Sequence, residues 1–93
     1  MRAPVALHIA TPADAKPETV AQRVRRLQAE AKALAKDHVS SLLASMTETE
    51  GLAREIASGG EIYHPGAQER ARRIADELAS QRATLEAIAR RVG

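Results

Sequence analysis

Apolar residues recur every three or four positions over two long stretches of the chain, which is the spacing of one face of an α-helix. The first stretch carries two overlapping stripes, Val20, Val24, Leu27, Ala31, Leu34, His38 and Ser41, and then Ala35, Val39, Leu42, Met46, Thr49, Ala53 and Ile56. The second stretch carries one regular stripe, Ala71, Ile74, Leu78, Gln81, Leu85, Ile88 and Val92. This pattern predicts one long helix and one shorter helix.

Proline and glycine pairs mark the expected ends of the two helices. Pro17 suits a first helical turn, with Asp14 or Lys16 near its cap. Gly59-Gly60 ends the long helix, because glycine takes the left-handed conformation that closes a helix. After the breaker pair Pro65-Gly66, the second helix is expected from about residue 67 to residue 91.

Gly51 lies inside the predicted long helix, where it costs about 1 kcal/mol relative to alanine. The pairs Ser45–Glu48 and Thr47–Glu50 have capping-box spacing, so a kink or a restart near residues 46–51 stays open. No proline enforces a break there. We therefore favour one long helix.

Folding the two helices back on each other gives an all-α antiparallel hairpin. In the expected register Glu55 faces Arg70, and the second helix ends opposite about Leu34. No part of their own hairpin then packs against residues 17–33 of the long helix. An isolated helix of that length is only marginally stable in water. We expect two copies to associate into a four-helix bundle, with Val20, Val24, Leu27 and His38 at or near the interface.

Residues 1–16 differ from the rest of the chain. Val5, Leu7 and Ile9 alternate with Ala6 and His8, which is the period of a strand with one apolar face. Five residues of alternation are a weak signal. The segment is expected to be an N-terminal arm, either flexible or a short strand, ahead of a helical hairpin domain at residues 17–93.

The composition narrows the classes of function. The 93 residues include no cysteine, so disulfides, thiolate nucleophiles and cysteine-ligated metals are excluded. No apolar run is long enough to span a bilayer, and we expect a cytoplasmic protein without membrane contact. The 14 basic and 12 acidic residues are interspersed, which favours surface ion pairs over a one-sided basic field.

The connection between the helices holds the one tyrosine of the chain, Tyr63, beside His64. The favoured interpretation is that Ile62 and Tyr63 close the open end of the helix pair while His64 stays in water. A partner contact through Tyr63 and His64 is the next alternative. An acid–base pair of Tyr63 and His64 is less favoured, because a small alanine-rich bundle offers little room for a pocket and an oriented third group. A metal site on Glu61 and His64 is also less favoured, because glycine and proline flank the motif and core positions lack glutamate.

Three arginine groups could contact phosphates: Arg23, Arg25 and Arg26; Arg70, Arg72 and Arg73; and Arg90 and Arg91. Glu69, Asp76 and Glu77 dilute the second group, and aromatic residues for base stacking are missing. An ion-paired, solvated face is therefore the favoured interpretation of these arginines.

No phosphate loop, nucleophile motif or dinucleotide motif is present in the sequence. We expect a non-enzymatic protein without a cofactor, acting as a homodimeric helical module that binds its own copy and another protein. The alternative is a helical protein that associates with nucleic acid through its arginine clusters.

Overall fold

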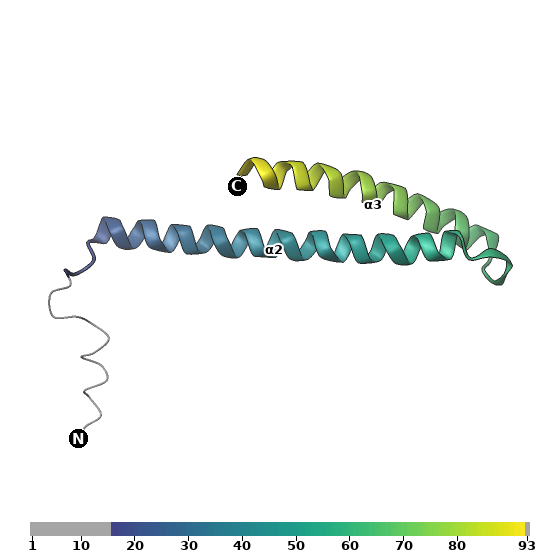
Figure 1. The fold of residues 1–93 in the computed structure, drawn as a ribbon, viewed down its shortest axis with the longest axis horizontal. Coiled ribbons are helices and arrows are strands. Elements are labelled where there is room, and N and C mark those ends of the chain that lie inside the picture. The colour runs from purple at the N-terminus through teal and green to yellow at the C-terminus, as the bar shows by residue number, and fades with distance from the viewer. Residues whose placement is uncertain (1–15, 93) are drawn as a thin grey trace, which may run out of the picture. The chain divides into compact units, whose positions relative to one another are not determined.

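The computed structural model describes residues 16–92 of the chain. The described residues form α2 (Val20–Ala57), a short 3-10 turn η1 (Gly60–Ile62) and α3 (Pro65–Val92), and they include no strand. The predicted all-α class and the helical hairpin are confirmed (Figure 1). Of the described residues, 16–31 belong to one compact unit and 32–92 to a second, which contains α3 and the part of α2 that faces it. The predicted arm lies outside the described residues apart from Lys16.

The start of α2 is set by Thr19 and not by Pro17. The Thr19 hydroxyl accepts a hydrogen bond from the backbone N–H of Gln22 at 3.1 Å, and the Gln22 side chain accepts one from the Thr19 N–H at 2.8 Å. This reciprocal pair is a capping box, which satisfies two N–H groups at the helix start. The prediction that the helix begins at Pro17 was therefore wrong by three residues.

The long helix runs through Gly51 without a break. The Thr47 hydroxyl donates to the backbone carbonyl of Leu43, one turn earlier, so Thr47 sits in a helix interior and caps nothing. A side chain at Gly51 would meet no atom within 4 Å. The favoured prediction of one continuous helix is confirmed.

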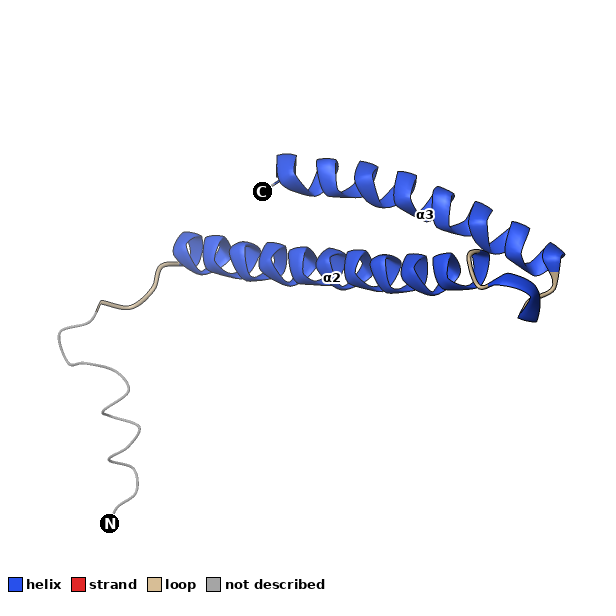
Figure 2. Cartoon of the chain, turned by 45° about the vertical axis from the view of Figure 1, so that its right-hand side comes forward, coloured by secondary structure: helices blue, strands red, loops and turns tan. Residues whose placement is uncertain are grey.

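The hairpin core lies next to the connection and consists of three alanines. Ala53 of α2 packs with Ala71 and Ala75 of α3, and Ile56 and Ala57 pack against this cluster. The two helices are closest beside the connection and diverge towards the end of α3 (Figures 1 and 2). Alanine allows a close approach of helix backbones, whereas the larger side chains further along hold the two helices apart.

Ion pairs link the helices beyond the alanine cluster. Arg82 of α3 contacts the half-buried Glu50 carboxylate of α2 at 3.1 Å, and Arg54 contacts Asp76 at 3.5 Å. The expected Glu55–Arg70 pair is absent from the described ion pairs. The alanine contacts follow the predicted register, whereas the two ion pairs join α2 to residues that lie one to two turns further along α3 than this register places them.

Candidate functional site

The connection between the helices is held by its own side chains. Gly60 has a φ of 82°, the left-handed region that glycine enters without strain. The half-buried Tyr63 ring lies so close to Gly59 that a side chain there would collide with it. Ile62 is 84% exposed, so the prediction that Ile62 helps to close the helix pair was wrong. Ile62 lies in the 3-10 turn, and only Tyr63 turns back against the chain.

His64 caps the start of α3. Its Nδ1 atom accepts a hydrogen bond from the backbone N–H of Gly66 at 2.9 Å, and its backbone carbonyl accepts the N–H of Gln68. Pro65 takes the first helical position, where its missing N–H costs nothing. α3 therefore begins two residues before the predicted start. A side chain at Gly66 would touch the His64 ring at 3.1 Å, so glycine leaves room for the cap.

Gln68 closes the other side of the connection. Its side-chain amide donates to the backbone carbonyls of Ile56 at 3.2 Å and Gly60 at 3.0 Å. The last carbonyl groups of a helix have no hydrogen-bond donor within the helix. Gln68 of α3 provides such a donor at the end of α2 and in the turn that follows. Sequence reasoning missed this role, since a glutamine in a first helical turn is an ordinary residue without knowledge of the turn geometry.

The two residues of the candidate metal motif, Glu61 and His64, lie in different surroundings. His64 uses Nδ1 for the cap, and Glu61 lies in the exposed 3-10 turn. Within residues 16–92, no group of three or more His, Asp and Glu side chains is close enough to hold a metal ion. Tyr63 and His64 thus shape the bend between the two helices, and Glu61 is exposed in the turn.

Several of the arginines that were candidates for phosphate binding form ion pairs with carboxylates of the same chain. Arg26 contacts Glu18 and Glu30, both at 2.9 Å. Hydrogen bonds from Arg26 hold the pKa of the Glu18 carboxyl below its usual value, and those to Glu18 and Glu30 raise the pKa of Arg26. Arg23 and Arg25, the neighbours of Arg26, pair with none of the described carboxylates.

The second arginine group is more completely neutralised. Arg72 and Arg73 both contact Glu69, and Arg72 lies 3.9 Å from Asp76. Hydrogen bonds from Arg72 and Arg73 lower the pKa of Glu69, and the bonds to Glu69 raise the pKa of Arg72. Arg70 is exposed and outside this cluster. An ion-paired face accounts for Arg72 and Arg73, as the sequence favoured.

Only one side of α2 faces α3. The positions that are half-buried or buried along it are Val39, Leu43, Met46, Glu50, Ala53, Ile56 and Ala57. The predicted second stripe is thus partly displaced, because Leu42 and Thr49 are exposed. Leu42 and Thr49 belong instead to a neighbouring stripe along the whole helix.

We call this neighbouring set the outer stripe of α2. It contains Val20, Val24, Leu27, Ala31, Leu34, His38, Leu42, Ser45, Thr49, Leu52 and Ile56, which follow one another in steps of three or four. All of these residues except Ile56 are exposed, with Val20 at 81% and Leu34 at 70%. The predicted interaction residues Val20, Val24, Leu27 and His38 therefore share one uncovered helix face.

An apolar groove continues the outer stripe onto the hairpin. We call it the open face, and it is lined by Leu42, Met46, Leu78, Gln81, Thr84, Leu85 and Ile88. Four of these residues come from the regular α3 stripe seen in the sequence. The same stripe includes Ile74, which is 49% exposed. Most of the α3 stripe thus lines the edge of the hairpin, and among its residues with described burial only Ala71 is buried.

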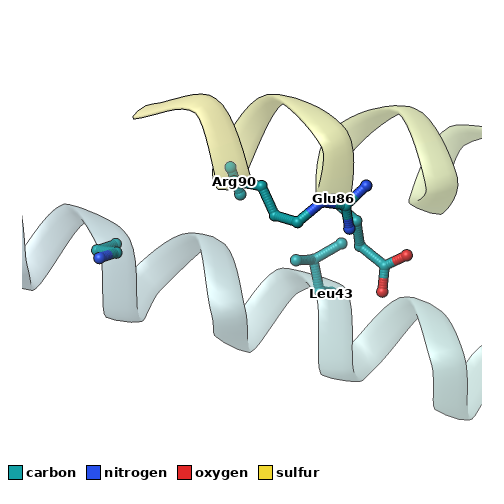
Figure 3. Close-up of a pocket in the computed structure, with 5 residues that line it drawn as sticks. Leu43, Glu86 and Arg90 are labelled. Atoms are coloured by element: carbon teal, nitrogen blue, oxygen red, sulfur yellow. The ribbon is translucent and has the colours of Figure 1, made fainter. Parts of the chain in front are cut away.

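The opposite side of the hairpin carries charge. Leu43 of α2 points towards Glu86 and Arg90 of α3 across a hollow that Lys36 and Ala89 also line (Figure 3). Arg82 contacts Glu86 at 3.4 Å on the same helix. The hairpin therefore has one charged side and one apolar side, and the apolar side is the candidate functional surface.

Neither helix in the described part of the chain contains a stretch long and apolar enough to cross a membrane. No family model, curated protein or solved structure matches this chain.

Proposed function

We propose that this protein is a non-enzymatic helical interaction module that works as a homodimer, and that its paired form is the one that binds another protein. The observation that carries the proposal is the contrast between the core and the surface. The described chain buries three alanines, while eight large aliphatic residues of its two helices stay 46–81% exposed.

The magnitude of this contrast favours association. Full burial of a leucine, isoleucine or valine side chain contributes roughly 1.5–3 kcal/mol. Covering the exposed half of eight such residues would contribute on the order of 10 kcal/mol per chain. A micromolar dissociation constant corresponds to about 8 kcal/mol of net binding free energy, and association itself costs about 4–15 kcal/mol. A symmetric dimer buries these residues on both chains, so the total free energy of burial can exceed the cost of association. The residues counted are Val20, Val24, Leu27, Leu34, Leu42, Leu52, Ile74 and Ile88.

The test is the molar mass in solution, measured by light scattering over a range of concentrations. The expected mass is twice the 10.0 kDa of one chain. Leu34→Lys should shift the mass to that of a monomer, because it places a charge on the outer stripe. Lysine and leucine have similar helix propensities, so the substitution leaves the helix itself intact.

The matched control is Ala29→Lys, which adds the same charge on the helix face opposite the outer stripe and should leave the dimer unchanged. A wild-type protein that stays monomeric at every concentration would contradict the proposal. So would a Leu34→Lys protein that dimerises as well as the wild type.

The alternative function, binding of nucleic acid by the arginine clusters, can be tested with the same protein. Binding through Arg23 and Arg25 predicts a complex with a random DNA duplex that weakens steeply as salt is added. A stable complex of that kind, lost in Arg23→Gln/Arg25→Gln, would favour the nucleic-acid function over the proposed one.

A further inference from the structure

We propose that the two copies pair antiparallel along the outer stripe, with the two His38 residues meeting at the symmetry axis. This inference rests on the proposed dimer and specifies its geometry. The occupant of the open face is then a defined segment, residues 20–34 of the second copy.

The first support is the symmetry of the outer stripe itself. His38 is at the middle of α2, which runs from Val20 to Ala57. Counting outwards from His38, the stripe takes the same steps of four and three residues in both directions. Large aliphatic residues flank His38 on both sides and recur at both ends of the stripe, whereas Ala31, Ser45 and Thr49 lie between. An isologous contact requires this kind of self-complementary face.

This register places most large aliphatic side chains of the outer stripe beside aliphatic side chains of the partner. Leu34 lies beside the partner's Leu42, and Val24 lies beside the partner's Leu52. Val20 lies beside the partner's Ile56, which already packs against the alanine cluster. Every large aliphatic residue of the N-terminal half of the stripe except Leu27 thus gains a large aliphatic neighbour; Leu27 lies beside the partner's Thr49.

The open face provides a second contact surface for the partner's helix. The exposed Ile88 lines the open face together with Leu42 and Met46, and Ile74 belongs to the same α3 stripe. A helix that lies along the outer stripe at residues 42–56 therefore also contacts the α3 stripe. Each end of the dimer becomes a three-helix bundle, made of one hairpin and the N-terminal half of the partner's α2.

Charge selects the antiparallel orientation over the parallel one. Residues 16–36 contain six basic and two acidic residues, and residues 40–60, which lie beside them in this register, contain three acidic residues and one basic residue. Antiparallel pairing about His38 places the basic segment of one copy beside the acidic segment of the other. Parallel pairing would place the two basic segments side by side, which like-charge repulsion disfavours.

The experiment uses the absence of cysteine from the chain. Single cysteines replace Ala29, Ser40 or Thr47, all exposed and on the helix face turned away from the outer stripe. Each carries a spin label, and pulsed electron paramagnetic resonance measures the distance between the two labels of a dimer. Light scattering and circular dichroism confirm that each labelled protein is dimeric and helical.

The expected result is set by the rise of 1.5 Å per residue of an α-helix. Ala29 and Thr47 are equally far from His38, so their labels should give the same distance, with about 27 Å of separation along the helix axis. The Ser40 labels should be separated by only about 6 Å along the axis and give a clearly shorter distance.

Other arrangements give different patterns. A parallel dimer would give similar distances at all three positions. An antiparallel dimer in another register would make the axial separations at 29 and 47 differ by about 3 Å for each residue by which the partner is shifted. Either result overturns the inference while the proposed dimer stands. A monomeric mass with no interchain distance overturns the dimer as well. As a control, dilution with unlabelled chain must remove the measured distances.

Discussion

Single side chains of the connection work on the ends of the helices. His64 accepts a backbone N–H at the start of α3, and Gln68 donates to two carbonyls at the end of α2 and in the turn. Gly59 and Gly66 are small where the Tyr63 and His64 rings pack. The residues that looked most like a catalytic or binding site in the sequence are therefore those that fix the bend.

The cap formed by His64 gives a prediction for stability. His64→Ala leaves the Gly66 N–H without a partner and should lower the free energy of unfolding by about 1 kcal/mol. His64→Asn keeps a short side chain with an acceptor and should retain most of that stability. Urea unfolding followed by circular dichroism measures both. Equal stability of the alanine variant and the wild type would mean that the cap contributes nothing.

At the scale of the elements, α2 is one helix of 38 residues in which glycine has no structural role at position 51. Gly60, in contrast, has a φ that residues with a side chain rarely adopt. The two glycines therefore make a matched pair for substitution by alanine.

Gly51→Ala should raise the free energy of unfolding by about 1 kcal/mol, because alanine restricts the unfolded chain and favours the helix. Gly60→Ala should lower it by about 1–2 kcal/mol, because the left-handed conformation strains a residue with a Cβ atom. Thermal melting of the two variants beside the wild type measures the difference. A destabilised Gly51→Ala protein would show that α2 bends at this position in solution.

The helices also show how much of the structure can be predicted from the sequence. The apolar period and the breaker pairs predicted two helices, their connection and the continuity of α2, because these depend on local chemistry. The caps at Thr19 and His64 were missed, since each depends on a side chain meeting a backbone group a turn later. The face that each stripe presents was only partly predictable. The regular α3 stripe suggested a core, whereas the small alanines beside the connection let the helices meet on a different line.

At the scale of the whole molecule, the dimer proposal links stability to concentration. A partner that binds the folded state adds free energy that grows with its own concentration, about 2.7 kcal/mol at a hundredfold excess over the dissociation constant. The melting temperature should therefore rise as the protein concentration is raised. Leu34→Lys should melt lower and independently of concentration. A wild-type melting temperature that is constant over a hundredfold range would contradict the coupling.

The position of the alanine cluster has a consequence for the order of folding. Ala53 and its partners in α3 are only about twenty residues apart in sequence, so closing the loop between them costs little chain entropy. Contacts of such short range form early and fast. The bend and its alanine contacts are therefore the natural starting point, from which both helices grow outwards. In the proposed dimer, the outer stripe is covered last, in the step in which two chains meet.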